Sequence, residues 1–242
     1  MDKVRTVSDT KRDFYTHHVR PINSIYRRVV EELMVEMHLL SVNANFKVDP
    51  IYCLGVVTSF DRFMSGYKPE QDKESIFNAL CQSVGGDPQK YREEAGNTLE
   101  IAQRIPKDEL VAWIASPNSL AGTENIATIL QEIANNPNYK YSRLFAIGLY
   151  TVLEKADPEL VKDKEKRNKA LETISEGLKF SSEKIQKDLD LYRSNLEKME
   201  QVLNVMEEAI AADRKKREKR LLDKKPQPEQ QEEKNPQENN AP

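Results

Sequence analysis

The side chains that could do chemistry are few in this sequence of 242 residues, and their spacing matches no common catalytic or metal-binding motif. The three histidines are His17, His18 and His38. None belongs to an HExxH, Glu-x-x-His or His-Asp arrangement, so the usual helical zinc, di-iron and hydrolase signatures are missing. His17 and His18 lie in a locally basic stretch and could touch an anionic partner. The favoured interpretation places both at the surface, or at an interface, of the first helix.

Clustered carboxylates occur at Glu31, Glu32 and Glu36, a combination that metal or acid–base sites require. However, Arg27 and Arg28 precede two of them at i,i+4 spacing, where opposite charges pair along a helix. This spacing favours an ordinary solvated helix face over a catalytic or metal site.

Nucleophile motifs are missing as well. The sequence has no GxSxG, and its two cysteines, Cys53 and Cys81, lie far apart in apolar segments that would raise a thiol pKa. They are predicted to be reduced, buried thiols, because neither CxxC spacing nor a dense cysteine framework is present. Gly85-Gly86-Asp87 is not a phosphate loop, since no Gly-Lys-Ser/Thr follows. The residues therefore predict no enzymatic activity, no metal and no cofactor.

One concentrated basic patch lies near the C-terminus and is a candidate for partner binding. It consists of Arg214, Lys215, Lys216, Arg217, Lys219 and Arg220. Such a patch could hold acidic lipid head groups, nucleic acid or an acidic protein surface. The favoured alternative is that these cations complement the helix dipole at a helix C-terminus. Aromatic residues that could stack on bases are absent from the patch, so no nucleic acid is expected.

A heptad stripe precedes this patch, with its apolar residues spaced 4-3-4-3-4-3-4. Its members are Ile185, Leu189, Tyr192, Leu196, Met199, Leu203, Met206 and Ile210. The pattern predicts a coiled-coil helix over about residues 182–222. Packing within the chain and packing on a partner both remain open. Because methionine-rich faces suit adaptable partners, Tyr192, Met199 and Met206 are also candidate partner-binding residues.

The elements that position these residues are all predicted to be helices. Apolar residues between 22 and 42 repeat with helical periodicity and cover about half of the helix, and we expect the other helices to pack on this one. Glycine is scarce, at 8 residues, and 32% of the chain is charged, which suits long solvated helices. The net charge of −3 gives no global attraction to nucleic acid or anionic lipid.

Domain organisation follows from start signals and composition. Asp-Pro pairs at 49–50, 87–88 and 157–158 predict helix starts. The expected fold is all-α, with a compact multi-helix domain over residues 1–156, an antiparallel helical hairpin or coiled-coil arm over 157–225, and a disordered polar tail over 226–242. The N-terminus lacks an apolar signal region, and no apolar run reaches the ~20 residues that span a bilayer.

Several long segments resemble one known family. They read VRTVSDTKRDFYTHHVRPINSIYRRVVEELMVEMHLLSVN, DPIYCLGVVTSFDRFMSGY, CQSVGGDP and YSRLFAIGLYTVLE. Over about residues 1–222 the chain resembles the thylakoid formation proteins, described as photosystem II biogenesis factors of cyanobacteria and chloroplasts. Chloroplast members carry a transit peptide, and since the sequence shows none, it resembles the cyanobacterial form, although a processed plant form stays open.

The resemblance implies a non-enzymatic accessory protein in the cyanobacterial cytoplasm, peripherally associated with the thylakoid membrane. It implies binding to FtsH protease complexes and, through them, an indirect link to photosystem II assembly and repair intermediates. The family offers no catalytic motif to transfer onto residues here. Two alternatives from the residues stay open: a membrane-surface or nucleic-acid binder acting through residues 214–220, and a helical enzyme without a familiar signature.

Overall fold

The protein is all-helical over the part of the chain that its computed structural model describes, which is residues 5–118 and 120–223, with side chains described as far as 218. These residues form α1 (Val7–His17), α2 (Ser24–Ser41), α3 (Pro50–Phe63), α4 (Asp72–Ser83), α5 (Pro88–Arg104), α6 (Lys107–Ala115), α7 (Glu124–Asn135), α8 (Arg143–Ala156), α9 (Pro158–Lys162), α10 (Lys164–Leu178) and α11 (Ser182–Asp223). The predicted all-α class is confirmed, including the long last helix.

The helices begin largely where the sequence signals a start. Asp49 and Asp87 accept hydrogen bonds from backbone N–H groups of the first turns of α3 and α5, and proline follows each of them at the first helical position. Asp157 starts α9 in the same way, but this helix lasts only 5 residues before Asp163 caps a new one, α10. The first helix is capped by Thr6, whose hydroxyl accepts from the Asp9 N–H.

The centre of the fold is the pair formed by α3 and α8, with α5 packed against both. Both α3 and α8 are buried around almost their whole circumference. Their backbones meet at two glycines, because a Cβ built on Gly55 or Gly148 would overlap backbone atoms of the opposite helix. The prediction that α2 is the helix on which the others pack is therefore wrong: α2 buries its apolar half against this pair's periphery and against α1 and α4.

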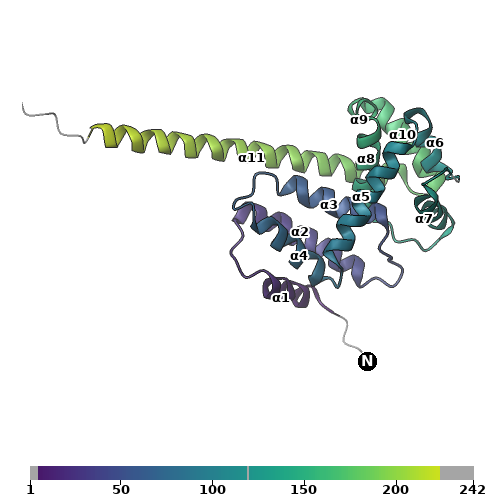
Figure 1. Ribbon diagram of the computed structural model, residues 1–242, viewed down its shortest axis with the longest axis horizontal. Coiled ribbons are helices and arrows are strands. Elements are labelled where there is room, and N and C mark those ends of the chain that lie inside the picture. The colour runs from purple at the N-terminus through teal and green to yellow at the C-terminus, as the bar shows by residue number, and fades with distance from the viewer. Residues whose placement is uncertain (1–4, 119, 224–242) are drawn as a thin grey trace, which may run out of the picture. The chain divides into compact units, whose positions relative to one another are not determined.

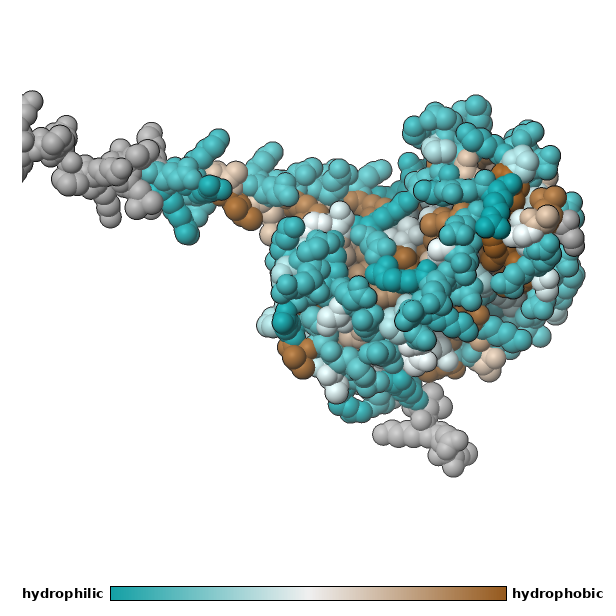
Figure 2. All heavy atoms as spheres, viewed as in Figure 1, coloured by the Kyte–Doolittle hydropathy of each residue, from teal (hydrophilic) through white to brown (hydrophobic). Residues whose placement is uncertain are grey.

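The helices gather in two groups around that centre (Figure 1). At one end α1 packs on α2 and α4, while at the other end α10 packs on α6 and α7, and α9 on α8. Gly177 brings the backbone of α10 against that of Ala115 at the end of α6. The visible face is mostly hydrophilic, with hydrophobic side chains showing between charged ones (Figure 2).

The domain boundary differs from the one that composition suggests. The chain divides into a first unit, Met1–Met199, and a second unit, Glu200–Pro242. The buried residues of α10, among them Leu171 and Ile174, pack in the first unit on α6 and α7, so residues 157–178 do not form one half of a hairpin arm. The proposed tail over 226–242 lies outside the described residues.

The helix α11 belongs to both units. Its first residues carry Ile185, Leu189 and Tyr192, which are buried in the first unit. Its described residues from Glu200 onward make up the second unit as far as the structure describes it. Among the described residues, no helix combines the length and hydrophobicity needed to cross a bilayer.

Candidate functional site

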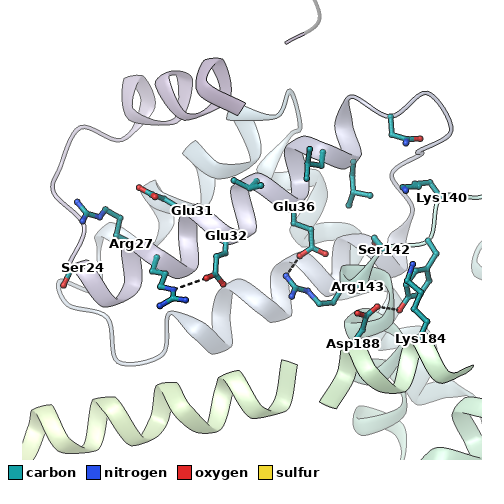
Figure 3. A pocket seen from close by; sticks show the side chains of 16 residues that line it. Ser24, Arg27, Glu31, Glu32, Glu36, Lys140, Ser142, Arg143, Lys184 and Asp188 are labelled. Carbon is teal, nitrogen blue, oxygen red and sulfur yellow. Dashed lines mark hydrogen bonds and ion pairs between the residues drawn. The ribbon is translucent and has the colours of Figure 1, made fainter. Parts of the chain in front are cut away.

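A groove of about 950 Å³ runs along α2 on the first unit (Figure 3). One wall is the outer face of α2, and the opposite side is formed by residues 140–143 and the start of α11. The lining residues are Ser24, Arg27, Arg28, Glu31, Glu32, Val35, Glu36, Leu39, Leu40, Asn43, Lys140, Tyr141, Ser142, Arg143, Lys184 and Asp188. The groove therefore combines an apolar strip with charges of both signs.

The carboxylates of α2 that line the groove are all engaged by groups of the same chain. Glu32 pairs with Arg28 at 3.1 Å, one turn earlier. Glu31 pairs with Lys11 of α1 at 3.0 Å and accepts a 3.2 Å hydrogen bond from the Tyr15 hydroxyl. The Lys11 ammonium lowers the pKa of Glu31, through its hydrogen bond to the carboxylate and through its charge. Of the two pairs that the i,i+4 spacing predicts, the one between Arg28 and Glu32 forms, whereas Glu31 pairs with Lys11 of α1 instead of with Arg27.

The segment before α8 and the first residue of α8 join three helices at the end of the groove through their side chains. The Tyr139 hydroxyl donates to Asp49 Oδ2 of α3 at 2.9 Å. The Tyr141 hydroxyl donates to Asp188 Oδ2 of α11 at 2.7 Å. The two hydroxyls, two residues apart in the chain, thus bind acceptors at the start of α3 and in α11. The segment therefore ties α11 to the body of the first unit.

The third bond of this segment crosses to α2. Arg143 binds Glu36 at 2.5 Å, an ion pair that is largely covered on the carboxylate side. Burial raises the pKa of Glu36, and the nearby guanidinium opposes that rise. The Lys184 ammonium lies 4.8 Å from the centre of the Tyr141 ring, a cation–π contact at the start of α11.

His17 is exposed at the end of α1, as predicted, whereas the other two histidines are buried. His18 is 2% exposed, and its Nδ1 lies 2.9 Å from the Ser75 hydroxyl oxygen of α4, so it lies at an interface between helices and the surface alternative is wrong. His38 is also buried, with Nδ1 at 2.8 Å from the Thr10 hydroxyl oxygen. Burial lowers the pKa of both imidazoles. His18 links the end of α1 to α4, and His38 links α2 to α1. These hydrogen bonds give both imidazoles a structural role, so their burial needs no catalytic explanation.

Chemically reactive groups are kept apart in the described part of the chain. Cys53 and Cys81 are buried free thiols, as predicted, and burial raises the pKa of each, that of Cys81 to about 12. Across residues 5–118 and 120–223 no three His, Cys, Asp or Glu side chains are placed to hold a metal. A thiolate nucleophile is therefore disfavoured at both positions.

The predicted partner-binding residues on α11 separate into two classes. Tyr192 is 2% exposed and packs edge-on against Phe63, with ring centres 5.7 Å apart, so its prediction as a partner-contacting residue is wrong. It is a core residue because the first turns of α11 fold back on the end of α3. Met199 and Met206 are half-buried, and between and beside them Val202, Val205 and Ile210 are exposed.

The basic patch is partly neutralised within its own helix. Arg214 pairs with Glu218 at 2.9 Å, and Arg217 pairs with Asp213 at 3.0 Å, both at i,i+4 spacing. Lys215 and Lys216 are exposed on the same helix. The side chains of Lys219 and Arg220 lie outside the described residues.

Comparison with known proteins decides the family. A family model described as thylakoid formation protein matches residues 6–221, which include the groove and the described C-terminal face. The chain belongs to the thylakoid formation protein family. The resemblance inferred from the sequence is thereby confirmed.

Relatives in the thylakoid formation family are similar along nearly their whole length. The protein named Thf1 of Gloeothece citriformis is 63% identical over 223 residues, or 92% of this chain and 99% of that protein. Thf1 of Trichormus variabilis is 61% identical over 220 residues, or 91% and 94% of the two chains. A solved structure described as Psb29 superposes with a TM-score of 0.76 at 42% identity, covering 88% of this chain and 98% of that one.

The thylakoid formation family is one of biogenesis factors rather than of known enzymes, and these relatives support a role in thylakoid formation and photosystem II biogenesis. The sequence analysis did not identify the groove as a site. A signal was present, because Val35 and Leu39 interrupt the polar half of α2. What the sequence could not show is that residues 140–143 and the start of α11 face that interruption.

Proposed function

We propose that the protein is a non-enzymatic accessory factor that binds FtsH protease complexes at the thylakoid surface and thereby supports photosystem II repair. The observation that carries the proposal is the apolar face of α11 from Met199, the last residue of the first unit, onward. Met199, Leu203, Met206 and Ile210 continue the heptad spacing there, and Ile210 is 65% exposed. A sustained apolar stripe on an exposed helix is typical of a helix-pairing surface.

The residues beside this stripe widen it. Val202 is 43% exposed and Val205 is 65% exposed, and hydrophobic side chains are visible among hydrophilic ones on α11 (Figure 2). At helical spacing, Val202 lies on the same side as Met199 and Met206. Glu200 and Glu207 flank the stripe, so a partner helix with apolar knobs and basic flanks would be complementary to it.

Binding without catalysis agrees with the chemistry of the first unit. Its cysteines are buried thiols with raised pKa values, and its buried imidazoles, His18 and His38, are held by hydroxyl groups of neighbouring helices. The protein therefore acts by offering surfaces, and its effect on photosystem II follows from the partner that those surfaces hold. Its contact with the membrane is peripheral and comes through that partner.

The test is recovery of FtsH from thylakoid extract on the immobilised full-length protein. One variant carries Val202→Gln, Leu203→Gln, Met206→Gln and Ile210→Gln, since glutamine keeps helix propensity while removing the apolar face. A matched control changes Gln201, Asn204 and Glu208 to Ala on the opposite face. We expect recovery to fall at least tenfold for the first variant and to stay unchanged for the control. Equal recovery on all three proteins would rule out this face as the protease contact.

Truncation has to respect the structure. Deletion from residue 181 would remove Ile185, Leu189 and Tyr192 from the core, so a loss of binding would report unfolding. Ending the chain after Met199 keeps these residues and removes the second unit. The intact first unit alone should fail to recover the protease.

The competing function, a lipid or nucleic-acid surface at residues 214–220, is separated by a second measurement. Changing Arg214, Lys215, Lys216 and Arg217 to Gln should leave protease recovery within about twofold, because two of these cations are already paired on the helix. If instead flotation with anionic vesicles, or a gel shift with DNA, is strong and is lost in this variant with the expected salt dependence, the basic patch is the functional surface.

A further inference from the structure

We propose that the groove along α2 binds an amphipathic helix of a partner protein, one with a short apolar stripe and acidic residues toward both ends. This surface lies entirely in the first unit and is separate from the α11 face assigned to the protease. The protein would then hold two partners at once and join them. The inference goes beyond the proposed function, and it does not require that the α11 face bind FtsH.

The apolar part of the groove has the spacing of a helix-packing ridge. Val35 and Leu39 of α2 line the groove one turn apart, and Val42, the C-cap residue that follows the helix outside the groove lining, continues their row. Leu39 is 58% exposed, Val42 42% and Val35 36%, although the opposite face of α2 is buried. A row of this kind is complementary to the grooves of another helix.

The opposite side of the groove supplies a second row. Lys184 and Asp188 of α11 line it, and Leu191, at i+7 from Lys184, lies on the same helix face and is exposed. A helix laid in the groove would therefore contact two helices of the first unit. The groove follows α2 and the two residues after it, from Ser24 to Asn43, roughly 28 Å at 1.5 Å per residue, which accommodates about 18 residues of a partner helix.

The charges of the groove indicate which charges a bound partner helix should carry. Its four carboxylates are all engaged: Glu31, Glu32 and Glu36 by cations, and Asp188 by the Tyr141 hydroxyl. By contrast, within the described ranges the side chains of Arg27 and Lys140 form no hydrogen bond or ion pair, although the charge of Arg27 contributes to lowering the pKa of Glu31. Arg27 lies toward one end of the groove, and Lys140 lies toward the other (Figure 3). A partner with carboxylates at both ends would meet these cations.

A protein helix fits this surface better than a lipid does. Anionic lipid head groups attract basic clusters, but here carboxylates alternate with the cations along the wall, and they would repel a uniformly anionic surface. A helix can place an acidic side chain opposite each unmatched cation and leave the carboxylates facing its polar backbone ends or water. The mixed charge pattern thus confers register as well as affinity.

The test uses two synthetic helical peptides of about 18 residues, each with one row of leucines at i, i+4 and i+7 spacing. One peptide carries glutamates toward both ends, and the other carries lysines at the same positions. Binding to the full-length protein is followed by fluorescence anisotropy of labelled peptide. We expect the acidic peptide to bind at least tenfold more tightly than the basic one, with an affinity that falls as salt rises.

Variants of the protein locate the binding. Leu39→Gln should weaken the acidic peptide about tenfold or more, and Lys140→Glu should weaken it about threefold to tenfold, mainly through the association rate. Val48→Gln is the matched control, because Val48 is exposed and does not line the groove. All three variants should keep the wild-type thermal unfolding temperature and the wild-type recovery of the protease.

Other results would overturn the proposal. Equal binding of the two peptides, or binding that Leu39→Gln leaves intact, would show that the groove is not the docking surface. Self-association of the protein that Leu39→Gln abolishes would assign the groove to a second copy. Binding to anionic vesicles that Lys140→Glu abolishes, without peptide binding, would assign it to a lipid surface. Loss of protease recovery with intact peptide binding would affect the proposed function alone.

Discussion

Replacing Gly148 by alanine should destabilise the protein strongly, although the substitution adds only one methyl group. An added Cβ at this position would overlap the carbonyl oxygen of Ile51 in α3 and lie 2.9 Å from its carbonyl carbon. It would also lie 3.0 Å from the backbone nitrogen of Gly55. These are backbone atoms of a buried helix, so no side-chain rotation can relieve the overlap. The two central helices, α3 and α8, have to move apart.

The magnitude follows from that separation. Relief requires a displacement of about 1 Å, and a gap of 0.5–1 Å already forfeits roughly a quarter to a half of the dispersion attraction across an interface. Overpacked cores lose about 1–3 kcal/mol, and a contact between rigid backbones belongs at or above the upper limit. Alanine recovers about 1 kcal/mol of helix propensity. We expect a net loss of about 3 kcal/mol, which lowers Tm by about 6–12 °C in a domain of this size.

The assay is thermal and urea unfolding followed by circular dichroism and by the single tryptophan, Trp113. Gly96→Ala is the matched control, since Gly96 lies in α5 with nothing within 4 Å of a built Cβ. The same substitution should there stabilise the protein by about 0.5–1 kcal/mol through helix propensity alone. The reasoning is refuted if Gly148→Ala has a Tm equal to or above that of the wild type.

Three further predictions follow from burial. Burial raises the pKa of Asp49 to about 6, above its unfolded value of about 4. The folded state therefore favours the protonated carboxyl, and the free energy of unfolding is highest below pH 4 and decreases as the pH rises through 6. The wild type should lose up to about 3 kcal/mol of unfolding free energy between pH 4 and 7 through this group, and Asp49→Asn should not show that decrease. Urea titrations across this pH range measure it, and equal pH dependence of the two proteins would contradict the prediction. Cys53 and Cys81, buried with raised pKa values, should resist Ellman's reagent at pH 8 in the native protein and both react in urea; rapid native labelling would show that the core opens. Tyr192→Ala should lower the free energy of unfolding by about 3–5 kcal/mol and Ile210→Ala by less than about 0.5 kcal/mol, because only Tyr192 is a core residue. Equal losses in urea unfolding would show that Ile210 is also part of the folded core.

The sequence predicts well what is local. Helix starts at Asp49 and Asp87 depend on a carboxylate and a following proline, which act within one turn and need no distant residue. The break between α10 and α11 near Ser182 and the continuity of the long last helix likewise follow from periodicity along one segment. The burial of both cysteines follows from the apolar stretches that contain them.

What the sequence does not predict are relations between segments far apart in the chain. Tyr192 and Ile210 belong to one heptad stripe, yet the first is in the core and the second is exposed, because periodicity fixes the side of a helix that is apolar and not what covers it. His18 is buried since Ser75 lies opposite, 57 residues away.

The amino-acid order alone therefore determined the helical class, most helix boundaries and the family, because each depends on neighbouring residues or on long matching segments. Tertiary structure alone decided that α3 and α8 form the centre, since the close approach of Gly55 and Gly148 requires two segments 93 positions apart to meet. It also decided that Val35 and Leu39 face a groove, because the wall opposite α2 comes from residues 140–143 and α11. Burial and charge pairing depend on the sum of such distant contacts, and no single stretch of sequence contains that sum.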